Sequence, residues 1–130
     1  MATIKRFEDL EIWQNARKLS KVIIEISVTT DLKNDYKLKD QIKSAAGSVM
    51  DNIAEGFERD GNLEFRQFLS FAKGSSGETR SQLYRTFDSG YISEDQLKSL
   101  VDEYEQLSRR ISSFISYLNK KDYKGTKFKE

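Results

Sequence analysis

Apolar residues recur at intervals of three and four along most of the chain, the spacing that keeps side chains on one face of a helix. Four such stretches cover about residues 8–29, 36–59, 63–89 and 94–119. No strand-like alternation and no internal repeat competes with this pattern. The sequence therefore predicts an all-α protein with four long amphipathic helices.

Each predicted helix has one apolar stripe that we expect to face a common core. The stripes are, in chain order, Ile12, Ala16, Leu19, Ile23 and Ile26; Leu38, Ile42, Ala45, Ala46, Val49, Ile53 and Phe57; Phe65, Leu69, Ala72, Ser76, Thr79 and Leu83; and Leu97, Leu100, Tyr104, Leu107, Ile111, Ile115 and Leu118.

Boundary signals separate these helices. The chain has no Pro, so nothing interrupts a long helix. Asn34 or Asp35 is the expected N-cap of the second helix, Gly90 ends the third, and Ser93 begins a capping box with Gln96. The short turn at residues 60–62 predicts that the second and third helices pack as an antiparallel hairpin.

The expected architecture is an up-down-up-down antiparallel four-helix bundle over residues 1–119. Residues 120–130 are basic and lack helical periodicity, so we expect them to form a disordered tail. A chain of 130 residues, 37% hydrophobic and 33% charged, fits one globular domain.

Composition removes most catalytic chemistry. The chain has no Cys and no His, which excludes thiol nucleophiles, disulfides and the commonest metal ligands. We expect no enzymatic activity, no metal and no cofactor. The net charge of +1 gives no overall attraction to nucleic acid or to a membrane. Without an apolar signal core or a stretch long enough to span a bilayer, the expected location is cytoplasmic, with no membrane partner.

Two segments place small and polar residues inside helical patterns, namely residues 48–56 and 68–78. On a helical wheel, both polar stripes lie to one side of the apolar centre of their helix, by a similar angle. Because the two helices are antiparallel, the stripes lie either in the seam between helices two and three or on the two outer flanks. We interpret them as a buried seam or a subunit interface. The residues assigned to it, together with one aromatic of the first helix, are Trp13, Ser48, Asn52, Glu55, Gly56, Phe68, Phe71, Gly74, Ser75 and Glu78.

Some of these residues also allow other interpretations. Glu55 and Glu78 could act as an acid and base or hold a divalent cation, although the di-iron version also requires His. The run 74–77 is rich in Gly and Ser but lacks the spacing of a phosphate loop, so close helix packing explains it better. Trp13 could stack on a base, but a Trp beside a core stripe is more often a packing anchor.

Four ordered segments carry a family resemblance: Phe7–Ala16, Ser48–Gly56, Phe68–Glu78 and Gly90–Ile92. They resemble the four-helix-bundle proteins called ribosomal RNA intervening-sequence proteins, over roughly residues 7–118. The resemblance implies a helical bundle that assembles into a homo-oligomer, commonly a ring of five, with no established enzymatic activity. Related small bundles are accessory proteins of reverse transcriptases, in which a basic ring contacts nucleic acid. This chain lacks their overall basicity. Family members often have Pro where this chain has Met50.

Surplus apolar residues point to the same oligomer. The first helix carries Leu10, Trp13, Ile24 and Val28 beside its core stripe, and the third adds two phenylalanines of the motif. Such a surplus on a lone bundle predicts an interaction surface. The expected partner is a second copy of the chain, and the number five comes only from the resemblance.

RNA, DNA or a nucleic-acid enzyme is a further candidate partner. The candidate contacts are Lys33, Lys37, Lys39, Lys43, Lys120, Lys121 and Lys124. Asp35 and Asp40 interrupt the first four, so a solvated helix face explains them equally well. The alternative function is a protein-interaction module that makes no contact with nucleic acid.

Overall fold

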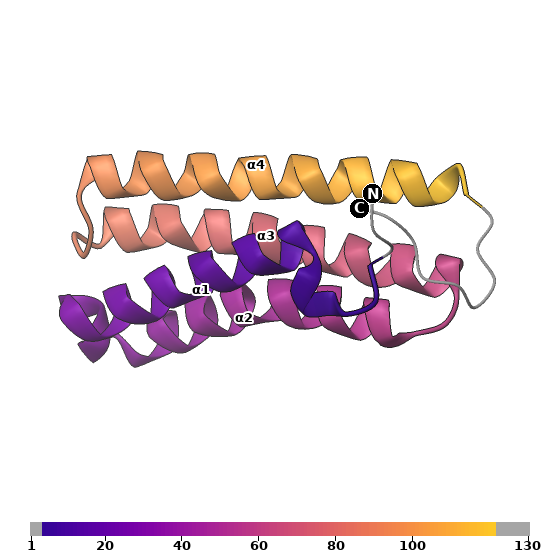
Figure 1. Cartoon of the computed structure of the whole chain (residues 1–130). Coiled ribbons are helices and arrows are strands. Elements are labelled where there is room, and N and C mark those ends of the chain that lie inside the picture. Colours follow the sequence, from indigo (N-terminus) through magenta and orange to yellow (C-terminus); the bar gives the residue numbers. More distant parts are fainter. Residues whose placement is uncertain (1–3, 122–130) are drawn as a thin grey trace.

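Four long helices pack side by side, and successive helices run in opposite directions (Figure 1). The computed structural model describes residues 4–121. The helices are α1 (Glu11–Thr29), α2 (Tyr36–Glu58), α3 (Asn62–Asp88) and α4 (Glu94–Asn119). Short 3-10 helices, η1 (Phe7–Asp9) and η2 (Asp31–Asn34), precede α1 and α2. No strand occurs within the described range, and the predicted all-α four-helix fold is confirmed.

The predicted boundary signals lie where the helices begin and end. Asp35 caps α2, because its Oδ1 accepts a hydrogen bond from the Leu38 backbone N–H at 3.3 Å. Ser93 and Gln96 exchange both bonds of a capping box at the start of α4. Gly90 follows α3 with a φ of +84°, a left-handed conformation that a residue without Cβ adopts at no steric cost.

The first helix begins later than the sequence pattern predicted. Residues 7–9 form η1, and Leu10 has extended backbone angles before α1 starts at Glu11. This turn lets Leu10 enter the core, where it is 0% exposed. Trp13 is half-buried and packs edge-to-face on Phe7, with ring centroids 5.2 Å apart. Only Ile24 and Val28 of the predicted surplus on α1 remain exposed, so that surplus was overestimated.

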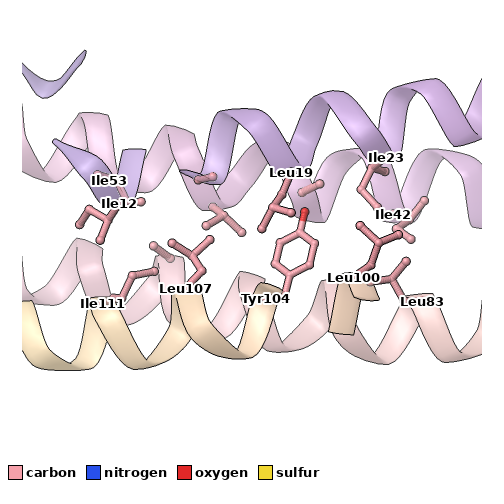
Figure 2. Packing of buried hydrophobic residues seen from close by; sticks show 14 of the residues in the cluster. Ile12, Leu19, Ile23, Ile42, Ile53, Leu83, Leu100, Tyr104, Leu107 and Ile111 are labelled. Atoms are coloured by element: carbon pink, nitrogen blue, oxygen red, sulfur yellow. The ribbon is translucent and has the colours of Figure 1, made fainter. Parts of the chain in front are cut away.

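The core follows the predicted stripes closely. Every predicted core position of α1, α2 and α3 is buried. Figure 2 shows part of this core, with Ile12, Leu19 and Ile42 directed toward side chains of α4. Near the end of α4, Phe114 is buried whereas Ile115 is only half-buried. Repeated steps of four turn the stripe away from the core, and the step of three from Ile111 to Phe114 corrects the drift. The prediction of Ile115 as a full core residue was therefore wrong.

Small side chains bring α3 and α4 together at mid-length. The Ser76 hydroxyl donates a hydrogen bond to the Tyr104 backbone carbonyl at 3.2 Å and lies 2.8 Å from the Ser108 hydroxyl. A side chain as short as Ser can reach the facing backbone only where two helices are close. These bonds also satisfy the two buried serine hydroxyls, which would otherwise destabilise the core.

Candidate functional site: the α2–α3 face

A polar cluster occupies the seam between α2 and α3. Asn52 Nδ2 donates to the Ser48 carbonyl at 2.8 Å and to Ser48 Oγ at 2.9 Å. Ser75 Oγ of α3 donates to the same Ser48 Oγ at 3.1 Å. All three residues are half-buried. Of the two placements that the helical wheel allowed, the mutual seam is therefore the one that the structure has for these three.

Gly56 marks the closest approach of the two helices. A Cβ added at Gly56 would lie 2.6 Å from Phe68 Cβ and 2.9 Å from Phe65 Cδ1, distances that real contacts do not show. Only glycine fits this position without a shift of α3. The ring of Phe68 is half-buried against this contact.

Phe71 extends the Phe68 packing onto the surface. The two rings meet edge-to-face with centroids 5.7 Å apart, yet Phe71 is 58% exposed. The Arg59 guanidinium lies over the other aromatic, 5.1 Å from the Phe68 centroid. Arg59 also pairs with Glu55 at 3.0 Å and with Glu64 at 3.5 Å. The outer rim of the seam is thus an aromatic pair bordered by an ion-pair network.

Gly74 and Glu78 lie on the exposed side of α3. A Cβ at Gly74 would meet no atom within 4 Å. We define the α2–α3 face as the predicted motif residues of these two helices that are exposed or half-buried, namely Ser48, Asn52, Glu55, Phe68, Phe71, Gly74, Ser75 and Glu78.

The two glutamates of the motif do not form a pair. Ser48 contacts Ser75, and because the helices are antiparallel, Glu55 and Glu78 lie on opposite sides of that contact. The ten residues of helical rise between them amount to about 15 Å along the axis. That separation excludes a shared proton or a shared cation. No group of three or more acidic residues able to hold a metal occurs between residues 4 and 121.

The remaining motif residues have structural surroundings. Residues 74–77 are part of the continuous helix α3 and form no loop. Trp13 lies on α1, apart from the α2–α3 face, with the Arg17 guanidinium 5.7 Å from its ring centroid. The described helices include none that is long and apolar enough to cross a membrane.

The predicted lysine contacts that the structure describes lie at two opposite ends of the bundle. Lys33, Lys37 and Lys43 are exposed near the start of α2. Lys39 Nζ donates to the Lys33 carbonyl at 3.3 Å and lies 4.8 Å from the Tyr36 ring centroid.

The second lysine group follows α4. Asn62 Nδ2 at the start of α3 donates to the carbonyl of Lys121 at 3.1 Å, which places Lys120 and Lys121 at the far end of α2. Lys43 lies 15 residues before the end of α2 at Glu58, so at least about 22 Å of helix separates the two groups. They do not form one patch. Lys124 and the rest of the predicted tail from residue 122 lie outside the described residues.

A charged groove on the other flank of α3 was not predicted. Lys73 and Arg80 are seven residues apart and meet Arg109 of α4 there. The i,i+7 spacing was the available signal, but sequence alone does not show which residues of α4 lie opposite.

Comparison with known proteins agrees with this architecture. The family model described as 23S rRNA-intervening sequence protein matches residues 8–113. The chain belongs to this family. A crystal structure from Bacteroides thetaiotaomicron, described as a protein with unknown function from the S23 ribosomal protein family, superposes with a TM-score of 0.72. It is 20% identical, and the match covers 81% of this chain and 95% of that chain. No curated protein matches the sequence.

In this intervening-sequence family member, α2 is one uninterrupted helix through Met50. A Pro there would remove a backbone hydrogen bond and favour a kink. The half-buried Met50 side chain instead packs against the core.

Proposed function

We propose that this intervening-sequence family protein is a non-enzymatic subunit of a homo-oligomer assembled through its α2–α3 face. The observation that carries the proposal is Phe71, a large aromatic that is 58% exposed on a rigid helix beside Phe68. Covering such a side chain with a second subunit removes apolar area from water and favours association.

Gly74 supports the proposal that the α2–α3 face is a subunit contact. A glycine inside a helix costs about 1 kcal/mol relative to alanine. Nothing in the described part of the chain requires glycine here, because an added Cβ would meet none of its atoms within 4 Å. Close approach by a helix of another subunit would account for the missing side chain, as Phe65 and Phe68 account for it at Gly56.

The exposed residues of α1 supply a second apolar patch on a different side. Ile24 is 46% exposed and Val28 is 62% exposed. Their helix packs against α2 and α4, so it lies diagonally across the bundle from α3. Contact between two different patches propagates from subunit to subunit and closes into a ring when the rotation permits. A ring of five is the form that the family resemblance suggests.

The test is the mass of the protein and of a single variant. We expect the wild type to be an oligomer by light scattering coupled to size exclusion, and Phe71→Asp to be a monomer with unchanged helicity. A carboxylate placed in an apolar contact loses hydration without gaining a partner. The matched control is Tyr84→Asp, because Tyr84 is a 50% exposed aromatic on the same helix, at the α3–α4 side.

A monomeric wild type at micromolar concentration would overturn the proposal. Equal dissociation by both variants would show that any charge on α3 disrupts assembly, and would remove Phe71 as the anchor. Loss of helix in Phe71→Asp would mean that the side chain stabilises the single bundle instead.

Association with nucleic acid is supported by a smaller observation. Lys33, Lys37 and Lys43 are exposed at one end of the bundle, and an oligomer would repeat them in every subunit. Asp35 and Asp40 lie in the same segment and offset most of this positive charge. The alternative is an oligomer that binds only protein, and the salt dependence of binding separates the two.

A further inference from the structure

The charged groove is a wide depression between α3 and α4, open to solvent, with a volume of about 670 Å³. Its lining from α3 includes Lys73 and Arg80, and its lining from α4 includes Arg109, Glu105 and three serines, Ser108, Ser112 and Ser113. We call this set the cationic groove. It lies on the opposite flank of α3 from the α2 seam.

Positive charge exceeds negative charge in the cationic groove. It holds three cations and one carboxylate. The carboxylate of Glu105 is 3.8 Å from Arg109, too long for a hydrogen bond. Neither Lys73 nor Arg80 has an ion-pair partner in the part of the chain that the structure describes, whereas Arg59 and Lys98 elsewhere have close carboxylates. Two uncompensated cations beside a third favour the binding of an anion.

Arg80 is the most constrained of the three cations. Its side chain is half-buried, and its Nε is shielded from solvent with no acceptor among the described residues. A guanidinium that is partly withdrawn from water without a partner loses solvation, which another contact can offset. An anion on the outer nitrogens would offset the positive charge, because that charge is delocalised over the whole guanidinium.

The hydroxyl groups complete the donor set. Ser112 is half-buried and Ser113 is exposed at the groove, and neither is engaged in a side-chain hydrogen bond within the described chain. Ser108 already contacts Ser76 at 2.8 Å. Guanidinium, ammonium and hydroxyl donors together are the groups that proteins use to bind phosphate oxygens.

We propose that the cationic groove binds phosphate groups. Lys73 and Arg80 are about 10 Å apart along α3, so the groove suits two or more linked phosphates better than one. Such groups occur in a diphosphate compound or along a nucleic-acid strand. This site is independent of the oligomer contact proposed above, because it uses the other flank of α3.

The probe is pyrophosphate, titrated into the full chain by calorimetry at constant ionic strength. Arg80→Gln and Lys73→Gln should each weaken binding by about tenfold, as expected for loss of one charged hydrogen-bond donor. Glu105→Gln should strengthen binding because it removes the one carboxylate among the described residues that line the groove. The controls are Arg85→Gln, an exposed arginine of α3 bonded to Gln41, and Lys98→Gln, an exposed lysine of α4.

Absence of binding at millimolar pyrophosphate would overturn the proposal, as would equal losses in the groove variants and the controls. Strengthening by Glu105→Gln with weakening by Arg80→Gln would support it, because a merely structural defect would not change affinity in both directions. A labelled single-stranded oligonucleotide identifies the source of the phosphates. Displacement of the oligonucleotide by pyrophosphate indicates a nucleic-acid backbone, and independent binding indicates a small phosphate compound.

Discussion

Tyr104 combines complete burial with a hydroxyl that has no hydrogen-bond partner in the described structure. Figure 2 shows its ring crossing the core with the oxygen directed toward Leu19 of α1. The surroundings are apolar, and burial raises the pKa of the Tyr104 hydroxyl, with the Glu103 carboxylate adding to the shift. An unpartnered hydroxyl in such a place lowers the free energy of unfolding.

Tyr104→Phe should therefore stabilise the protein, by roughly 1 kcal/mol in urea unfolding at neutral pH. The direction in which stability changes at alkaline pH follows from the raised pKa of Tyr104. The folded state keeps the phenol proton above pH about 10, where the unfolded chain releases it, so stability is present below that pH and falls as the pH rises.

The variant should lose less stability than the wild type above that pH. Some alkaline loss should remain, because a hydrogen bond to Asp35 raises the pKa of Tyr91 as well. Destabilisation at neutral pH would show that the Tyr104 hydroxyl has a partner in solution.

At the scale of the element, α2 and α3 use glycine in two opposite ways. Gly56 allows Phe65 and Phe68 to approach the backbone of α2, whereas Gly74 faces open space in the single chain. The same substitution at both positions therefore separates packing within the bundle from packing between bundles.

Gly56→Ala should destabilise the bundle by about 1–3 kcal/mol, the usual range for overpacking. Gly74→Ala should stabilise the isolated bundle by up to about 1 kcal/mol through helix propensity, and should weaken the oligomer if α3 is an interface. Thermal unfolding and light scattering on both variants give the two readouts. A stable Gly56→Ala variant would show that α3 shifts easily at Phe68.

At the scale of the whole molecule, the charged groups are distributed over separate regions. One lysine group lies at the start of α2, another follows α4, and the cationic groove lies midway along α3 and α4. The loop that joins α3 to α4 is at the same end as the first group, where Arg85 donates to Gln41 at 3.1 Å.

If the first lysine group contacts nucleic acid, affinity for a labelled RNA or DNA duplex should fall steeply with salt. The double change Lys37→Gln and Lys43→Gln should lower the slope of log affinity against log salt by about two, roughly one per phosphate contact. Lys21→Gln on α1 is the control, because it removes an exposed lysine that is not one of the predicted contacts. A salt-independent affinity, or a slope that only the control changes, would favour the protein-interaction module.

The sequence by itself determined the helices, their caps and nearly all of the core. These depend on local spacing, which is visible in the chain: the stripe from Ile12 to Ile26, the φ-permissive Gly90 and the capping residue Ser93 act within one or two helical turns. The family resemblance could also be recognised from ordered segments, because the family model matches the same region.

Only the tertiary structure decided which side chains meet across helices. A helical wheel gives an angle about one axis but not the axial register between two helices. The contact of Ser48 with Ser75 fixes that register, and it separates Glu55 from Glu78. The fold of η1 buries Leu10, and the packing of α3 on α4 brings Lys73 and Arg80 to Arg109. These outcomes depend on how rigid helices pack in three dimensions, and no local pattern in the chain encodes them.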